Sequence, residues 1–213
     1  TPLRMPGFAK LVAGMLTQLG YGQVDVLGVS WGGALAQQFA HSFPGRCRRL
    51  ILAATSTGLF AVPGDPRAFW RLMWSSRFDD AESIVKHADT IYGGVFRKNP
   101  ECAREHMSEI VPPRTLGYLG QLFAIWGWTS VHWLFTLKQP TLIMVGSDDP
   151  LVPSINGRIM KVLIPDAELV ELDCGHLFLV TQAELAVPII HRFLGERQRR
   201  AAVPALLPAP RSH

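Results

Sequence analysis

Apolar residues near the start of the chain recur at the three- to four-residue spacing of a helix. They are Phe8, Leu11, Val12, Met15, Leu16 and Leu19. Gly20 and Gly22 come directly after them, and glycine commonly ends a helix. A short β-branched run over 24–29 then predicts a strand, and helical spacing resumes at Ala34 and lasts until Pro44. The pattern therefore predicts a helix, a strand, a tight turn and a second helix.

Three further apolar runs, at 50–54, 141–145 and 169–172, have the length of buried strands. A closing helix is predicted from about residue 182 to residue 194. Strands that are apolar on both faces and alternate with helices are typical of a parallel sheet covered on both sides. The sequence therefore predicts the α/β fold class.

Aromatic residues gather between the second and third predicted strands, where all but one of the six tryptophans lie. A segment of that length is too long for an ordinary crossover, so we expect a helical cap inserted above the sheet. The predicted organisation is a first core part at 1–55, the helical cap at 56–138, a second core part at 139–195 and a flexible tail at 196–213.

Composition and charge narrow the class of protein. The 213 residues are 48% hydrophobic, which suits one domain or one domain with an inserted subdomain. The formal net charge is +4, but +3 of it lies after Leu194, so the body is nearly neutral. We expect a frayed tail, with adhesion to an acidic or interfacial surface as the alternative. No basic patch is interleaved with aromatic residues, which disfavours nucleic acid as a partner.

Cys47, Cys102 and Cys174 are odd in number and far apart, which favours reduced thiols in the cytoplasm. No histidines show metal-ligand spacing, so we expect no metal site. No apolar run approaches the roughly 18 residues of a membrane helix, and no secretory signal is visible. These patterns predict a cytoplasmic protein without a metal or a membrane span.

The segment Gly28-Val29-Ser30-Trp31-Gly32 fits the pattern G-x-S-x-G between a predicted strand and a predicted helix. Side chains at either glycine are expected to collide with the neighbouring backbone of so sharp a turn. A serine at a helix N-terminus faces N–H groups that stabilise developing negative charge. The alternative is an ordinary glycine-rich turn with a serine that caps the helix.

A serine nucleophile needs a base and an acid that orients it, and both follow downstream. Asp149 comes shortly after the strand predicted at 141–145, and His176 shortly after the one at 169–172. Since ligands of parallel sheets gather at the carboxyl ends of the strands, these positions support a catalytic triad and disfavour the capping serine. Asp149 precedes the rigid Pro-Leu-Val-Pro stretch and is the expected acid; Asp148 is the alternative.

Several segments resemble the intracellular poly(3-hydroxyalkanoate) depolymerases of bacteria, particularly the medium-chain-length type, within the α/β-hydrolase superfamily. The similar stretches are YGQVDVLGVSWGGALAQQFAHS at 21–42, LILAATS at 50–56, IYGGVFR at 91–97, GYLGQLFAIWGWTSVHW at 117–133, QPTLIMVGSDDPLVP at 139–153 and GHLFLVTQAE at 175–184. The serine and histidine segments occur in many hydrolases, whereas IYGGVFR and GWTSVHW are far more selective.

The resemblance implies a serine ester hydrolase without a cofactor, with Ser30, Asp149 and His176 as catalytic residues. It implies a 3-hydroxyalkanoate polyester granule as substrate and partner. The Trp31 N–H is then the expected oxyanion donor. Five side chains are expected to bind the substrate, with His132 as a packing residue of the cap rather than a second base. They are Trp31, Trp126, Trp128, His132 and Trp133. The resemblance does not settle the oligomeric state.

One departure from the family is large. A complete member has strands before the serine strand and a loop that supplies a second oxyanion N–H. Nothing ahead of Leu3 can supply them, so we expect a chain that lacks the N-terminal strands of the fold. Loss of one oxyanion donor costs about 2.7 to 4 kcal/mol in the transition state, and the strand at 24–29 becomes an apolar edge. We therefore expect this chain by itself to be inactive or to aggregate.

Two other classes of function stay open at this point. The same triad serves other capped α/β-hydrolases, such as lipase-like esterases, carbon–carbon bond hydrolases and cofactor-free haloperoxidases. A dehalogenase is disfavoured because it needs an aspartate where Ser30 stands. A noncatalytic remnant that binds granules is the alternative outside enzymes.

Overall fold

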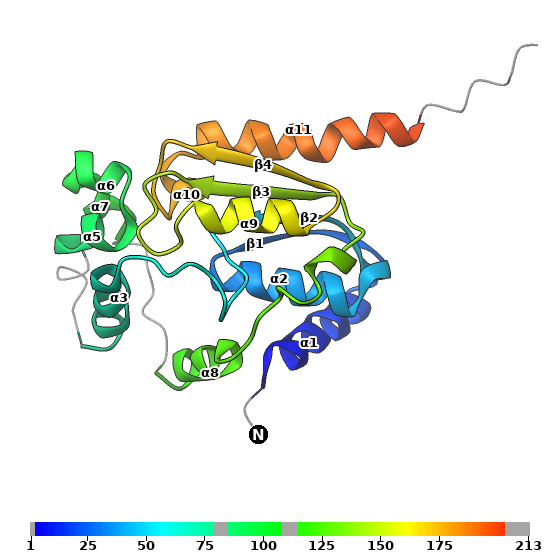
Figure 1. Cartoon of the computed structure of the whole chain (residues 1–213), viewed down its shortest axis with the longest axis horizontal. Helices are drawn as coiled ribbons and strands as arrows, with labels where there is room; N and C mark the ends of the chain where they lie inside the picture. Colours follow the sequence, from blue (N-terminus) through cyan, green and yellow to red (C-terminus); the bar gives the residue numbers. More distant parts are fainter. Residues whose placement is uncertain (1–2, 79–84, 108–114, 203–213) are drawn as a thin grey trace, which may run out of the picture.

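The computed structural model describes residues 3–78, 85–107 and 115–202 (Figure 1). Its centre is a sheet of parallel strands, in the order β1 (Val24–Val29), β2 (Cys47–Ala53), β3 (Thr141–Gly146) and β4 (Ala167–Leu172). The predicted parallel sheet is therefore confirmed. In the described part of the chain, a helix and no strand precedes β1, which forms one edge of the sheet.

Strand β2 begins earlier than predicted because its first residues have partners that the apolar pattern does not reveal. The guanidinium of Arg48 forms an ion pair with the Asp25 carboxylate of β1, and Arg49 Nη1 lies 3.7 Å from Asp25 Oδ2. Asp25 is also opposite Arg49 in the register of the two strands. Charge pairing thus allows charged residues to extend a strand that burial alone would begin later.

Helices cover both faces of the sheet, and the alternation of side chains along the strands decides which residue meets which layer (Figure 1). One face packs against α1 (Met5–Gln18), α2 (Trp31–Ser42) and α9 (Ile155–Leu163) through a core that includes Leu50, Leu52 and Ile143. The opposite face packs against α10 (Phe178–Thr181) and α11 (Ala183–Ala202) through Ile51 and Met144.

The segment predicted as a cap is helical in part, with irregular backbone at 56–65 and 126–133. It contains α3 (Pro66–Phe78), α5 (Ala88–Tyr92), α6 (Val95–Lys98), α7 (Pro100–Met107), α8 (Thr115–Ile125) and the short helix η2 (Leu134–Thr136). In Figure 1, α3, α5, α6 and α7 lie beyond the end of the sheet at which the strand arrows point. Trp128, Trp133 and Leu134, however, belong to the core that covers α2.

The C-terminal helix is longer than predicted. The expected helix ended at Leu194 and the expected flexible tail began at residue 196, but α11 continues to Ala202. Apart from Gly195, the added residues are good helix formers, so helix propensity extends the helix beyond its apolar stripe. Residues 203–213 of the predicted tail lie outside the described residues. Among the residues that are described, no helix has the length and hydropathy to cross a bilayer.

Candidate active site

Ser30 occupies the sharp turn between β1 and α2. Its backbone has φ 50° and ψ −118°, a conformation that residues with a side chain rarely adopt. Hydrogen bonds to other segments hold this turn, since Ser30 N–H donates to the Ala53 carbonyl at 2.9 Å and Thr55 Oγ1 donates to the Ser30 carbonyl at 2.7 Å. Strain of this kind persists only where the surroundings enforce it, and it concentrates at functional sites.

The glycines around Ser30 differ in how much room they have. A Cβ at Gly28 would lie 2.3 Å from the Gly32 carbonyl oxygen, so the expected backbone collision is present there. The same expectation is wrong for Gly32, where an added Cβ meets nothing within 4 Å. The close approach falls instead at Gly33, whose Cβ would lie 2.5 Å from the side chain of Thr55. The packing of α2 against the end of β2 therefore needs Gly33, which the motif did not single out.

Asp149 and His176 come together at the edge of the sheet where the parallel strands end. His176 Nδ1 lies 2.7 Å from Asp149 Oδ2, and both side chains are buried. The other carboxylate oxygen, Asp149 Oδ1, accepts hydrogen bonds at 2.9 Å from the N–H groups of Leu151 and Val152. One oxygen thus fixes the loop at 147–154 between β3 and α9, which we call the acid loop, while the other faces the imidazole.

Asp148, the alternative acid, points elsewhere. Its Oδ2 accepts a hydrogen bond from the Gly94 N–H at 2.7 Å and lies 3.2 Å from Arg97 Nε. Successive side chains in this loop therefore take separate partners, and the structure brings Asp149 rather than Asp148 to His176.

Cys174 lies close to His176 along the chain and is buried. Burial, and to a smaller extent the negative charges of Asp149 and Asp173, raises the pKa of the Cys174 thiol to about 12. The thiolate is the nucleophilic form of cysteine, so this side chain stays a neutral thiol at physiological pH. Cys174 is therefore a poor rival to Ser30 as a nucleophile.

Ser30 opens onto a small pocket of about 180 Å³. Its lining consists of Ser30, Trp31, Ala34, Thr55, Ser56, Gly58, Ile125 and Val152. Trp31 is held in this wall because its indole N–H donates to the Gln121 carbonyl at 3.1 Å and the ring of Phe8 packs against it nearly at a right angle. Thr55, Ile125 and Val152 were not predicted as pocket residues from the sequence. Thr55 could have been found because it follows the end of a strand, and Val152 because it lies close to Asp149 in the chain.

The other aromatic side chains expected to bind substrate lie elsewhere. Trp128 and Trp133 are 7% and 8% exposed, the first with its indole N–H bonded to Gln38 Oε1 at 2.8 Å and the second stacked on His41. Together with His132 they line a separate pocket of about 470 Å³. These tryptophans also pack in the core cluster that contains the buried residues of α2.

Trp126 is different again, since its side chain is 72% exposed. It directly follows Ile125, which lines the Ser30 pocket. Of the five expected substrate-binding residues, Trp31 therefore lines that pocket, Trp126 is exposed at the position after Ile125, and the other three line the separate pocket.

Comparisons with known proteins agree on the fold. The family described as the alpha/beta hydrolase fold matches residues 2–183. A poly(3-hydroxyalkanoate) depolymerase from Ectopseudomonas oleovorans is 52% identical over 95% of the chain, which spans 71% of that relative. A 2-hydroxy-6-oxononadienedioate/2-hydroxy-6-oxononatrienedioate hydrolase from a Pseudomonas species is 28% identical over 83% of the chain and 64% of the relative. The crystal structure of an enol-lactonase from Burkholderia xenovorans superimposes with a TM-score of 0.76 at 20% identity, over 91% of this chain and 74% of that one.

Proposed function

The chain belongs to the α/β-hydrolase family and, within it, to the group of the poly(3-hydroxyalkanoate) depolymerase, and from this premise we propose that it is a serine hydrolase that cleaves polyesters. The resemblance of its motifs implied the same group. Its substrate is a poly(3-hydroxyalkanoate), and its products are 3-hydroxyalkanoic acids. The observation that carries the proposal is the 2.7 Å contact between His176 and Asp149 at the sheet edge where Ser30 also lies.

The proposed reaction begins with His176 as a general base. The imidazole N–H at Nδ1 donates to the Asp149 carboxylate, which leaves Nε2 free to take the proton of the Ser30 hydroxyl. Ser30 Oγ bonds to the ester carbonyl carbon, and the tetrahedral intermediate collapses as His176 returns the proton to the departing alcohol. Water then adds to the acyl-enzyme in the same way and releases the acid, so Ser30 is regenerated and no cofactor is consumed.

The negative oxygen of the intermediate needs N–H donors. Because α2 begins at Trp31, the N–H of that residue is one of the first-turn groups that lack an acceptor within the helix. We propose it as one oxyanion donor.

A polymeric, water-insoluble substrate is supported by the surface next to the Ser30 pocket. Gly58 and Ile125 line that pocket, and each is followed along the chain by exposed apolar side chains. They are Leu59 and Phe60 after Gly58, and Trp126 after Ile125; we call these three the apolar rim. The N–H of Leu59 donates to the Trp128 carbonyl at 2.8 Å, which ties the two segments together. The apolar rim therefore suits adsorption to a polyester granule in the cytoplasm.

A fluorophosphonate probe, which reacts with activated serines, tests the proposal in the protein as its gene encodes it. The wild-type protein is expected to be labelled and to hydrolyse a polyester dispersion, whereas Ser30→Ala should do neither. Granule binding without labelling in both forms would instead identify a noncatalytic binding remnant and refute the hydrolase.

A second candidate is a hydrolase of small substrates, because relatives at 28% identity are named as hydrolases of dienedioates and trienedioates. Rates on polyester dispersion, short-chain esters and a carbon–carbon bond substrate, measured side by side, separate the two. Faster turnover of a soluble substrate than of the dispersion would favour this candidate over the depolymerase.

A further inference from the structure

The segment 92–97 of the cap contacts both loops that carry the Asp149–His176 pair. We infer that this segment and Asp148 form a clamp that fixes the two catalytic loops relative to each other, with Asp148 as a positioning residue. We call segment 92–97 the cap clamp. The inference rests on the proposed hydrolase function, but the contacts that support it are independent of the substrate.

The cap clamp holds the acid loop through Asp148. The Gly94 N–H donates to Asp148 Oδ2 at 2.7 Å, and Arg97 Nε lies 3.2 Å from the same oxygen. A Cβ at Gly93 would lie only 2.1 Å from the Asp148 carbonyl oxygen. The cap clamp therefore contacts both the side chain and the backbone of Asp148, the residue directly before Asp149.

The cap clamp also holds the loop at 173–177 between β4 and α10, which we call the histidine loop. The His176 N–H donates to the Tyr92 carbonyl at 2.8 Å, so the backbone of the base itself is fixed by the cap. A Cβ at Gly94 would lie 2.2 Å from Gly175 N, and a Cβ at Gly175 would lie 2.2 Å from the Tyr92 carbonyl oxygen. Backbones that approach so closely require glycine on both sides.

The two loops complete the arrangement by touching each other. Asp148 N–H donates to the Cys174 carbonyl at 3.0 Å, which joins the acid loop to the histidine loop. Acid loop, histidine loop and cap clamp thus form a closed set of contacts around the Asp149–His176 pair. A change at any one contact shifts the distance between the carboxylate and the imidazole.

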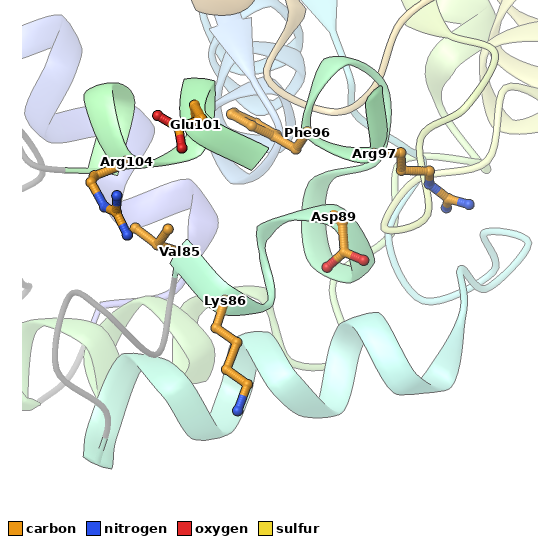
Figure 2. Close-up of a pocket in the computed structure, with 7 residues that line it drawn as sticks. All are labelled: Val85, Lys86, Asp89, Phe96, Arg97, Glu101 and Arg104. Atoms are coloured by element: carbon orange, nitrogen blue, oxygen red, sulfur yellow. The ribbon is translucent and has the colours of Figure 1, made fainter. Parts of the chain in front are cut away.

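The cap clamp is anchored in the cap by Phe96. Its ring is buried in a cluster with Ala88 and Ala103, from α5 and α7. Figure 2 shows the rim of a pocket of about 260 Å³, where Phe96 and Arg97 leave α6 in opposite directions. Phe96 points into the cap and Arg97 away from it, and Arg97 is the side chain that pairs with Asp148. Helix α6 therefore connects the packed interior of the cap, through Phe96, to the acid loop, through Arg97.

A merely structural role and a positioning role predict different kinetics. If Asp148 only stabilised the fold, its loss would lower the amount of folded enzyme and leave the folded fraction fully active. If it positions the pair, the folded enzyme itself loses turnover, because a displacement of about 1 Å costs on the order of 100-fold in rate. Substrate binding in the Ser30 pocket, which Asp148 does not line, is then hardly affected.

The test compares Asp148→Ala, Asp148→Asn and Arg97→Gln. An asparagine oxygen still accepts from the Gly94 N–H, so Asp148→Asn retains one of the two side-chain contacts. For Asp148→Ala we expect kcat to fall about 10- to 100-fold with KM within about twofold of wild type. Asp148→Asn should recover part of that loss. Arg97→Gln, at a half-exposed position that does not endanger folding, should show a smaller loss in kcat.

A control variant and a spectroscopic measurement complete the test. Arg158→Gln removes an exposed ion pair of similar length with Glu171, away from the clamp, and should leave kcat unchanged. The far-downfield proton resonance of the His176–Asp149 hydrogen bond, assigned by its absence from Asp149→Asn, should shift or vanish in Asp148→Ala without any substrate present. A wild-type resonance and a wild-type kcat in folded Asp148→Ala and Arg97→Gln would refute the inference that Asp148 and the cap clamp position the catalytic pair. A shifted resonance in a protein that hydrolyses no ester would support the clamp and refute the proposed function.

Discussion

Asp149 Oδ2 lies 2.7 Å from His176 Nδ1, while Oδ1 of the same carboxylate accepts the N–H groups of Leu151 and Val152. The acid thus has two tasks on two different oxygens. One oxygen orients the imidazole, and the other holds the shape of the loop that presents it. Substitutions can therefore separate the chemical task from the structural one.

Asp149→Asn is expected to lower kcat by about 10⁴-fold while the melting temperature stays close to wild type. The amide oxygen can still accept from Leu151 and Val152, but the amide NH₂ then faces His176 and enforces the wrong tautomer. Asp149→Ala should lose the same activity and also about 1–2 kcal/mol of unfolding free energy. Equal stability of the two variants by denaturant titration would contradict the structural task of Oδ1.

Ser30→Gly is expected to be more stable than Ser30→Ala by about 1 kcal/mol, although both are inactive. The reason is the backbone φ of 50° at this position, which glycine adopts without strain and alanine does not. Thermal and denaturant unfolding of the two variants measure the difference. A Ser30→Ala protein as stable as Ser30→Gly would show that the turn stores no strain.

Gly33→Ala is expected to destabilise the protein by about 1–3 kcal/mol and to disturb Ser30, because the new Cβ would displace Thr55, which bonds to the Ser30 carbonyl. Gly32→Ala, at the neighbouring helical position with open space, is the matched control. It should stabilise the protein by about 0.5–1 kcal/mol through helix propensity. Unfolding curves give both values, and a larger loss at Gly32 than at Gly33 would contradict the packing described for α2.

The free energy of unfolding should fall with rising pH between about pH 9 and pH 12, in part because of Cys47. Burial, and then the charge of Asp25, raises the pKa of the Cys47 thiol to about 12, well above the roughly 8.5 of an unfolded cysteine. A raised folded pKa means that this stability is fully present below the unfolded pKa and is lost as pH rises toward the folded one.

Each such thiol contributes a slope of about 1.4 kcal/mol per pH unit in that window. Cys47→Ala, compared with wild type by denaturant titration at each pH, should have a shallower slope by about this amount. Parallel curves for the two proteins would show that Cys47 titrates normally.

Phe60→Ser and Trp126→Ser are each expected to lower the initial rate on a polyester dispersion by about tenfold, since each removes an exposed apolar side chain of the apolar rim. Rates on a soluble short-chain ester should stay within about twofold, because neither side chain lines the Ser30 pocket. Val162→Ser, at an 84% exposed position on α9, is the matched control and should change neither rate. Equal losses on both substrates would rule out an adsorption surface.

Periodicity and motif order by themselves determined the architecture of this protein. Strand β1 was predicted at its observed bounds, and the order of serine, acid and histidine places each after a strand. This succeeds because burial imposes a local rhythm on the sequence, and because parallel strands bring their carboxyl ends to one edge whatever the details of packing. Helix α11 exceeded its prediction because its last residues, apart from Gly195, are good helix formers, a signal that apolar periodicity does not carry.

The tertiary structure alone decided what each side chain does at that edge. The sequence favoured Asp149 over Asp148 as the acid, and the structure places Asp149 against His176. The contact of Asp148 with Gly94 of the cap, however, had no signal in the sequence. Likewise, Trp31 and Trp128 are alike in sequence, yet one lines the pocket and the other covers α2. These outcomes depend on contacts between segments far apart in the chain, and such contacts leave no periodic signal in either segment.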